Sequence, residues 1–195
     1  MLTPSIDTLL AAVRAKGFVT FAKPYDLNLI GLRAMPGKPD AFDDLFCIVY
    51  TDDAAKLQIE AFPCTTDPGL YHLQNPKYPS GTGIVVPGQY RRCWTLGLHQ
   101  QKYPALVQRG NITIALDANR DGVLDYGSRR VTGDSYGINC HHAGRRSTVV
   151  GKWSAGCQVL ANLADDDRKM ELCRLQVAHG HGEWFSYTLL EWPES

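Results

Sequence analysis

The sequence predicts a mainly β fold, either a β-sandwich or an open barrel, with a helix near each end of the chain. Short apolar runs recur between residues 18 and 117, and turn-forming residues separate them. Helix signals lie at residues 4–16, where apolar residues recur at helical spacing, and at about 163–178, where Asn162 can begin a helix and Gly180 can end it. Many short strands joined by polar turns are typical of an antiparallel β core.

The first predicted helix covers residues 4–16. Apolar side chains recur at positions 6, 9, 10 and 13, which lie on one face of a helix. Thr3 is a candidate N-cap with Pro4 at the first helical position, and Gly17 follows the last turn. We expect this helix to pack on the β core.

Eight runs have the composition of strands. They are FVTFAK (18–23), LNLIGLRA (27–34), LFCIVYT (45–51), KLQIEAF (56–62), GIVVPGQY (83–90), CWTLGLH (93–99), NITIALD (111–117) and EWFSYTLLEW (183–192). Turn formers such as PGKPD at 36–40 and TTDPG at 65–69 lie between them. The second helix is predicted at about 163–178, with Asn162 as its N-cap and three aspartates in its first turn.

Length and charge favour one domain over residues 1–195. A chain of 195 residues can bury a core without disulfides, and its net charge of zero gives no general attraction to nucleic acid or membranes. We therefore expect a monomer without nucleic-acid or membrane partners. The six cysteines lack zinc-finger spacing, so we expect five of them to be small buried residues, while disulfides stay open for a protein that works outside the cell.

The N-terminal segment does not have the pattern of a Sec signal peptide. No basic region precedes its apolar run, which Asp7, Arg14 and Lys16 interrupt, and no stretch approaches the length of a membrane span. We expect synthesis in the cytoplasm. A protein that acts on the cell wall would then reach it after lysis, through a phage holin or a secretion system, or by a signal outside this sequence.

Candidate catalytic groups gather in residues 137–160, GINCHHAGRRSTVVGKWSAGCQVL. His141 and Cys157 lie sixteen positions apart, and Ser154 and Gly156 come just before the cysteine. A nucleophilic cysteine needs a base to remove its proton and a backbone that lets a carbonyl approach. The segment offers all of these, so it predicts acyl-transfer chemistry at Cys157.

This segment resembles a known active-site signature. Ile138 and His141 followed by Ser154, Gly156 and Cys157 give the order I-x-x-H and then S-x-G-C, which is similar to the YkuD-type L,D-transpeptidases. Those enzymes act on the stem peptides of peptidoglycan. Where that family usually has glycine after the histidine, and an aliphatic residue and then arginine after the cysteine, this chain has His142, Gln158 and Val159. The resemblance indicates a divergent member.

The resemblance implies roles for the residues that match. Cys157 would attack an L-to-D peptide bond and form a thioester, and His141 would move the protons. Gly156 would allow backbone N–H groups to hold the oxyanion, and Ser154 would orient the site. An amine acceptor would give transpeptidation, while water would give carboxypeptidase or endopeptidase activity.

Four further side chains are candidates for substrate binding. Arg145 and Arg146 lie between the catalytic positions and are expected to recognise a carboxylate in place of the missing arginine, unless they are solvated loop charges. His142 is a competing base, because neighbouring side chains in an extended segment point to opposite faces. His99 ends a predicted strand, where it could line the substrate groove or be an ordinary surface or core histidine.

Residues 117–128, DANRDGVLDYGS, begin like a calcium loop. Asp117, Asn119, Asp121 and Asp125 occupy ligand positions, with Gly122 at the turn. The twelfth position is Ser128 and not glutamate, and no flanking helix pair is predicted. A weak structural calcium site and a metal-free turn rich in Asp and Asn are the two interpretations. No other cofactor is predicted.

Two rival functions remain from the sequence. Cys140, His141, His142 and Cys157, with His99, are residue types that zinc binds, although no recognised spacing is present. A non-catalytic cell-wall binding or interaction module on the same fold is the other. The missing arginine supports the module, and the intact Cys, His, Ser and Gly set opposes it.

Overall fold

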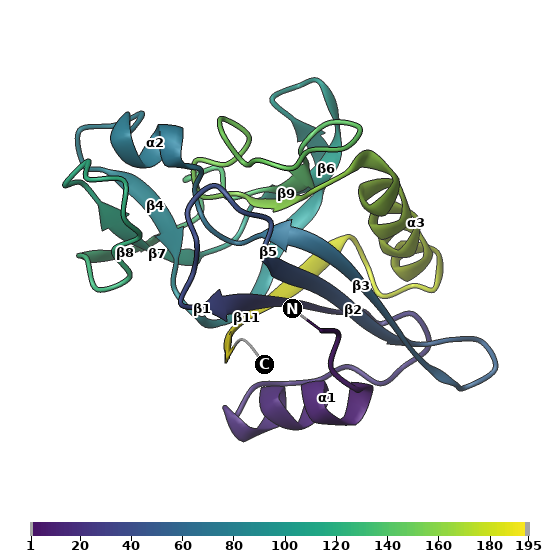
Figure 1. Cartoon of the computed structure of the whole chain (residues 1–195). Coiled ribbons are helices and arrows are strands. Elements are labelled where there is room, and N and C mark those ends of the chain that lie inside the picture. Colours follow the sequence, from purple (N-terminus) through teal and green to yellow (C-terminus); the bar gives the residue numbers. More distant parts are fainter. Residues whose placement is uncertain (1, 194–195) are drawn as a thin grey trace.

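The computed structural model describes residues 2–193, in which eight strands close into a barrel beside a smaller sheet (Figure 1). The barrel strands are, in spatial order, β1 (Asn28–Met35), β11 (Trp184–Pro193), β5 (Gly88–His99), β6 (Tyr103–Gln108), β9 (Cys140–His142), β10 (Gln158–Leu160), β3 (Leu57–Thr65) and β2 (Asp44–Thr51). The smaller sheet has the order β4 (Thr82–Val85), β7 (Ile112–Asp117), β8 (Arg130–Gly133). The predicted mainly β class is confirmed, and the barrel closes because β1 pairs with both β11 and β2.

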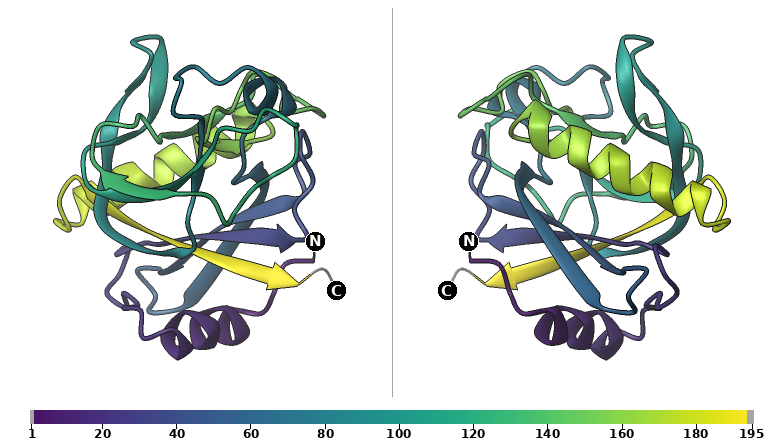
Figure 2. Two further views of the ribbon diagram at one scale, coloured as in Figure 1. Left: turned by 90° about the vertical axis from the view of Figure 1, so that its left-hand side faces the viewer. Right: turned by 90° about the vertical axis from the view of Figure 1, so that its right-hand side faces the viewer.

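Three helices lie on the outside. α1 (Ile6–Ala15) packs below the barrel, α2 (Leu70–Gln74) lies near the small sheet, and α3 (Leu163–Ala178) crosses the opposite side of the barrel (Figures 1 and 2). The helix after the cysteine begins as predicted, because the Asn162 side chain accepts from the Asp165 backbone N–H. The predicted Thr3 cap of α1 is wrong, since Ser5 caps that helix by accepting from the Thr8 N–H.

The two faces of β1 and β2 bury different partners. Leu9, Leu10 and Val13 of α1 pack with the outward-facing Ile30 and Leu32 of β1. The alternate positions of the same strands face the barrel interior and join the larger apolar cluster. The first predicted helix therefore covers the barrel from outside, away from residues 137–160.

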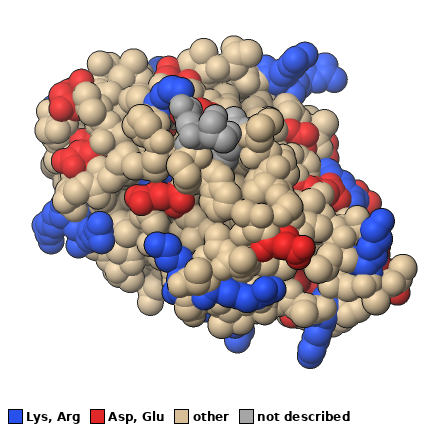
Figure 3. Space-filling model, turned by 60° about the horizontal axis from the view of Figure 1, so that its bottom comes forward, with Lys and Arg blue, Asp and Glu red and all other residues tan. Residues whose placement is uncertain are grey.

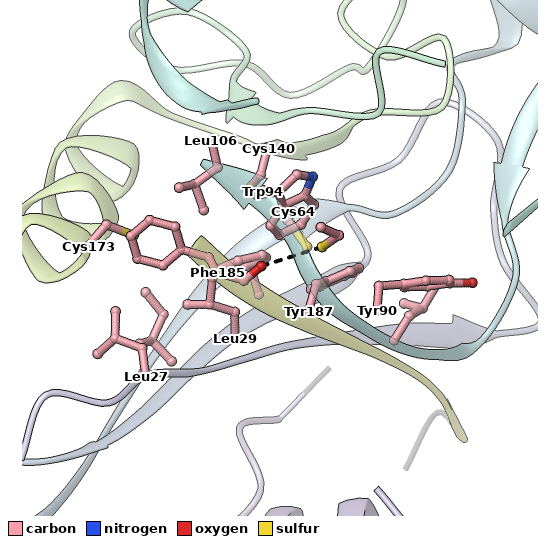
Figure 4. Packing of buried hydrophobic residues seen from close by; sticks show 14 of the residues in the cluster. Leu27, Leu29, Cys64, Tyr90, Trp94, Leu106, Cys140, Cys173, Phe185 and Tyr187 are labelled. Carbon is pink, nitrogen blue, oxygen red and sulfur yellow. Dashed lines mark hydrogen bonds between the residues drawn. The ribbon is translucent and has the colours of Figure 1, made fainter. Parts of the chain in front are cut away.

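The barrel interior is built on aromatic packing that reaches the candidate site (Figure 4). Tyr187 lies between Trp94 and Phe46, with ring centroids 4.6 and 6.0 Å away. Gly31 leaves room for it, because a Cβ there would lie 1.9 Å from the tyrosine oxygen. Trp94 Nε1 donates to Ile138 O at 2.7 Å, which fixes the chain just before the candidate catalytic histidine.

The predicted strand at 18–23 is wrong. Its backbone is bonded by side-chain amides: Gln89 pairs with both N–H and C=O of Val19, and Asn28 pairs likewise with Phe21. These amides satisfy the backbone without a neighbouring strand, so the β-like composition does not produce one. The other predicted strands form, with shifted ends, and GIVVPGQY divides between β4 and β5.

The surface carries charges of both signs. On the face that includes the bottom of the molecule, acidic and basic side chains are interspersed (Figure 3). Among residues 2–193, no helix is both long enough and apolar enough to cross a membrane.

Candidate active site

The ends of three barrel strands bring the candidate catalytic groups together. β9 and β10 run parallel with Val159 opposite His141, so Cys157 lies just before β10 and beside the start of β9. The hairpin of β5 and β6 adds His99. One ring nitrogen of His99, one of His141 and the sulfur of Cys157 all lie within 4.8 Å of one another. The sequence-predicted pair therefore meets in space, with a second imidazole.

Ser154 and Gly156 shape the turn that presents Cys157. The buried Ser154 hydroxyl donates to Cys157 O at 2.8 Å and accepts from the Gly156 N–H at 3.2 Å. Gly156 has φ +118°, and a Cβ there would lie 2.4 Å from Gly83 O. Both residues hold the loop, and the Gly156 N–H is already engaged by Ser154.

The thiol of Cys157 is largely buried. It donates to Gly137 O at 3.3 Å. Burial raises its pKa above the ordinary value, while the Asn139 backbone N–H and the charge of Lys77 act in the opposite direction. The resting group is therefore a neutral thiol that must lose its proton as it reacts.

His141 is held in the orientation and tautomer of a base. Its Nδ1 lies 3.0 Å from His142 O and 3.1 Å from the Tyr103 hydroxyl. Since a carbonyl only accepts, Nδ1 carries the proton and Nε2 presents a lone pair. That Nε2 is buried without a hydrogen-bond partner. Burial, and then His99, lowers the pKa of His141 to about 3, so the imidazole is neutral.

The hairpin of β5 and β6 supplies two aromatic side chains that contact His141. His99 and Tyr103 are opposite each other in the register, and Lys102 N–H donates to His99 O at 2.9 Å across the turn. Gln100 and Gln101 in that turn have positive φ angles of 49° and 59°. The His99 ring stacks on His141, with centroids 3.8 Å apart and an angle of 25° between the planes.

His142 lies outside the cluster. Its Nδ1 accepts from the Gly144 N–H at 2.9 Å, and its ring packs on Tyr103 at 4.4 Å. The two adjacent histidines point to different surroundings, as expected for an extended segment. Of the two candidate bases, His141 is the one near Cys157.

A cavity of about 600 Å³ opens onto Cys157 and His99. Arg145 and Arg146, the predicted carboxylate ligands, are exposed and do not line it. The basic side chains that do line it are Lys77 and Lys152, and no Asp or Glu among residues 2–193 joins them. Sequence reasoning missed both lysines as cavity residues, because Lys77 lies far before Cys157 in the chain, and no local pattern shows that Lys152 and not the two arginines of the segment 137–160 lines the cavity.

The walls of the cavity combine apolar and aromatic groups. The small sheet and the segment before β9 supply the apolar wall: Ile114, Leu116, Val131 and Ile138. The exposed aromatic residues Tyr78, Tyr136 and Trp153 stand at its edge. The small sheet is thus part of the site, although it is outside the barrel.

A buried ion pair supports β9 from behind. Lys169 of α3 is paired with Asp166 and donates to Cys140 O at 3.1 Å. Its Nζ also lies 3.6 Å from Cys140 Sγ. Both charged side chains are almost fully buried. This anchor fixes the backbone immediately before His141, and it occupies Cys140, which therefore does not join the site.

The arrangement fits acid–base chemistry better than the alternative metal site. A metal bonds an imidazole nitrogen in the ring plane, at about 2.0–2.1 Å for zinc. The His99 and His141 rings are nearly parallel and 3.8 Å apart, so no point near both lies in both planes. At least one ring would have to rotate out of the stack before both could bind one ion.

The calcium-like loop uses its side chains internally. Asp117, Asn119, Asp121 and Asp125 each accept from a backbone N–H within residues 121–127. Among residues 2–193, the three acidic members do not form a cluster in which three ligand atoms could share an ion. These bonds account for the turn without a metal, and calcium binding stays a prediction.

All six cysteines are buried and free of disulfides.

Compared with protein-family models, curated proteins and solved structures, the chain shows no match. The resemblance to L,D-transpeptidases therefore rests on the residues of the signature.

Proposed function

We propose that the protein is a cysteine acyltransferase or peptidase of the L,D-transpeptidase type that acts on peptidoglycan stem peptides. The observation that carries the proposal is the cluster of Cys157 with His141. The Nδ1–H of His141 is fixed on a backbone carbonyl, its Nε2 is buried without a partner, and one nitrogen of the ring lies within 4.8 Å of the Cys157 sulfur. A thiol beside an oriented neutral imidazole is the arrangement that nucleophilic catalysis requires.

Acylation would proceed at the sulfur. As Cys157 Sγ bonds to the carbonyl carbon, its proton passes to His141 Nε2. The C–N bond then breaks, His141 returns the proton to the leaving amine, and a thioester remains. An amine or water next attacks the thioester and gives its proton to His141. That proton returns to sulfur as the thioester cleaves.

The cavity favours a substrate that carries carboxylates. Lys77 and Lys152 line it, and none of its described lining residues is Asp or Glu, so an anion is attracted and a cation is not. The apolar wall accepts aliphatic side chains. Stem peptides have free carboxylates on short aliphatic residues, which matches both properties. The two lysines replace the predicted arginines in this proposal.

The test is digestion of isolated sacculi and muropeptides by the parent protein, with products identified by mass spectrometry. We expect product masses that change only when Cys157 is present, and a thioester adduct on Cys157 in the intact protein. The masses separate hydrolysis from transfer. Unchanged muropeptides with the folded parent protein would refute the proposal and favour a binding module.

A matched control keeps the result specific to this thiol. Cys157→Ala removes the nucleophile, while Cys47→Ala removes another buried thiol, from the cluster under α1. We expect loss of turnover only in Cys157→Ala. Equal loss in both variants would point to destabilisation and not to catalysis.

A further inference from the structure

His99 faces the cavity, whereas His141 lies behind it. His99 lines the cavity together with Cys157, and His141 is not among the lining residues. The two rings are stacked, and both contribute a nitrogen to the cluster around the sulfur. His99 is therefore placed to meet the reacting sulfur from the substrate side.

The tautomer of His99 follows from the hydrogen bonds of Asn139. The Gln108 backbone N–H donates to Asn139 Oδ1 at 2.9 Å, so the amide oxygen is identified and Nδ2 is on the other side. Asn139 Nδ2 lies 3.1 Å from His99 Nδ1 and must donate to it. His99 Nδ1 is thus an acceptor, and the ring proton is on Nε2.

His99 keeps this neutral form near neutral pH. Burial, and then the charge of Lys77, lowers its pKa to about 4. A neutral imidazole does not act as an acid at this pH, but its N–H can donate a hydrogen bond to a developing anion. With Nδ1 taken by Asn139, Nε2–H is the nitrogen of His99 that can donate.

The two imidazoles have opposite tautomers. His141 carries its proton on Nδ1, bonded to His142 O, and offers a lone pair at Nε2. His99 offers a donor at Nε2. The Cys157 thiol thus has a nitrogen lone pair of His141 to accept its proton. It also has an N–H of His99 to donate to the negative charge that remains on the sulfur.

We propose that His99 is a second catalytic residue, whose Nε2–H donates a hydrogen bond to the Cys157 sulfur as it becomes a thiolate. In this step the S–H bond breaks and the proton goes to His141 Nε2. His99 retains its own proton throughout. The inference rests on the proposed function for its place in turnover, but it concerns the thiol itself. It differs from a substrate-binding role, which would leave the thiol pKa unchanged.

The thiolate of Cys157 needs a hydrogen-bond donor because its sulfur is buried. Desolvation disfavours the thiolate, and the other groups that act on it are the Asn139 backbone N–H and the Lys77 charge. Hydrogen bonds to an ionised group are about twice as strong as neutral ones. A shift of one pKa unit corresponds to about 1.4 kcal/mol, or tenfold in thiolate fraction.

The experiment measures alkylation of Cys157 by iodoacetamide between pH 6 and 10 in the intact protein, read on the Cys157 peptide by mass spectrometry. His99→Phe keeps a stacked ring without a donor, and His99→Gln keeps an N–H near the Nε2 position without the ring. We expect His99→Phe to lower the rate at pH 7 about tenfold and raise the thiol pKa by about one unit. His99→Gln should stay within about threefold of the parent protein.

Two results would overturn the proposal: His99→Phe with the parent's pH profile, or His99→Gln as slow as His99→Phe. If His99→Phe does not fold, the ¹⁵N chemical shifts of the His99 ring in the parent protein decide, and a proton on Nδ1 contradicts the donor. Alkylation needs no peptidoglycan. Unchanged sacculi therefore refute the proposed function, while these readouts test His99 separately.

Discussion

Two polar clusters, similar in the sequence as candidate sites, differ in how their hydrogen bonds are satisfied. In the loop 117–128, each candidate ligand side chain accepts from a nearby backbone N–H. In the cluster of His99, His141 and Cys157, each imidazole uses its Nδ1 in a local hydrogen bond, and one nitrogen of each ring lies within 4.8 Å of the Cys157 sulfur. His141 Nε2 has no partner although it is buried.

The difference fits the proposal that one cluster is structural and the other reactive. Buried polar atoms are nearly always bonded, so an unpartnered one needs an explanation, and in the proposed function His141 Nε2 takes the proton of Cys157. In the loop, the hydrogen bonds of the side chains already account for the turn. The following predictions test this contrast, from the largest expected effect to the smallest.

The largest effect is expected at the two adjacent histidines. His141→Ala should reduce thioester formation by about 10²- to 10⁴-fold, because it removes the base. His142→Ala should retain much of the activity, since its ring is outside the cluster. Intact-protein mass spectrometry of acylated Cys157 measures both. The reverse order of the two variants would overturn the assignment of the base.

Stability should depend on pH through the same buried imidazole. The pKa of His141 falls from 6.5 to about 3 on folding, so the unfolded chain takes up a proton first as the pH drops. The folded state should therefore lose stability from about pH 6.5 down to about pH 3, by at most about 1.4 kcal/mol per pH unit for this group. Urea unfolding at several pH values measures the slope. An unchanged slope in His141→Gln would show that the group is not buried neutral.

A smaller effect is expected at the cavity lysines. Lys77→Gln and Lys152→Gln should each raise KM about 2- to 5-fold for a stem peptide with a free carboxylate, because exposed charge contacts contribute about 1 kcal/mol or less. The KM for the carboxamide form of the peptide should change less. Arg145→Gln, outside the cavity, is the matched control. A larger change with Arg145→Gln would return carboxylate recognition to the loop.

The smallest effect is expected in the loop 117–128. Asp121→Ala removes the acceptor of the Val123 N–H and should cost about 1 kcal/mol or less, with little change in turnover. A melting curve that is the same in millimolar calcium and in chelator is the expected companion result. A clear rise of Tm with calcium, lost in Asp121→Ala, would make this loop a metal site.

The site residues that lie close together in the sequence could be predicted from it, whereas the residues that only the fold brings to the site could not. His141, Cys157, Ser154 and Gly156 are in one segment, and the parallel pairing of β9 with β10 brings them together. Lys77 and the ring stack of His99 depend on segments far apart in the chain, whose packing no local pattern reports, and the place of Lys152 in the cavity wall depends on how its loop folds. His99 was a candidate for the groove, but its relation to His141 required the β5–β6 register.

The same division applies to the fold. The helix at 6–15 and the long strands follow from apolar periodicity, and the helix at 163–178 follows from its N-cap and its acidic first turn. The run at 18–23 has strand composition but binds side-chain amides, and β8, β9 and β10 are too short to show a period. Closure of the barrel is a property of the strand order, which depends on contacts between the two ends of the chain.

The length of the turn between β5 and β6 determines which side chains of this hairpin face the site. It holds His99 and Tyr103, the two groups that flank His141, directly opposite each other in one hairpin. Side chains alternate between the faces of a strand, so adding or removing one residue there would turn one of the pair away. Selection on this segment should therefore act on its length as strictly as on its residues.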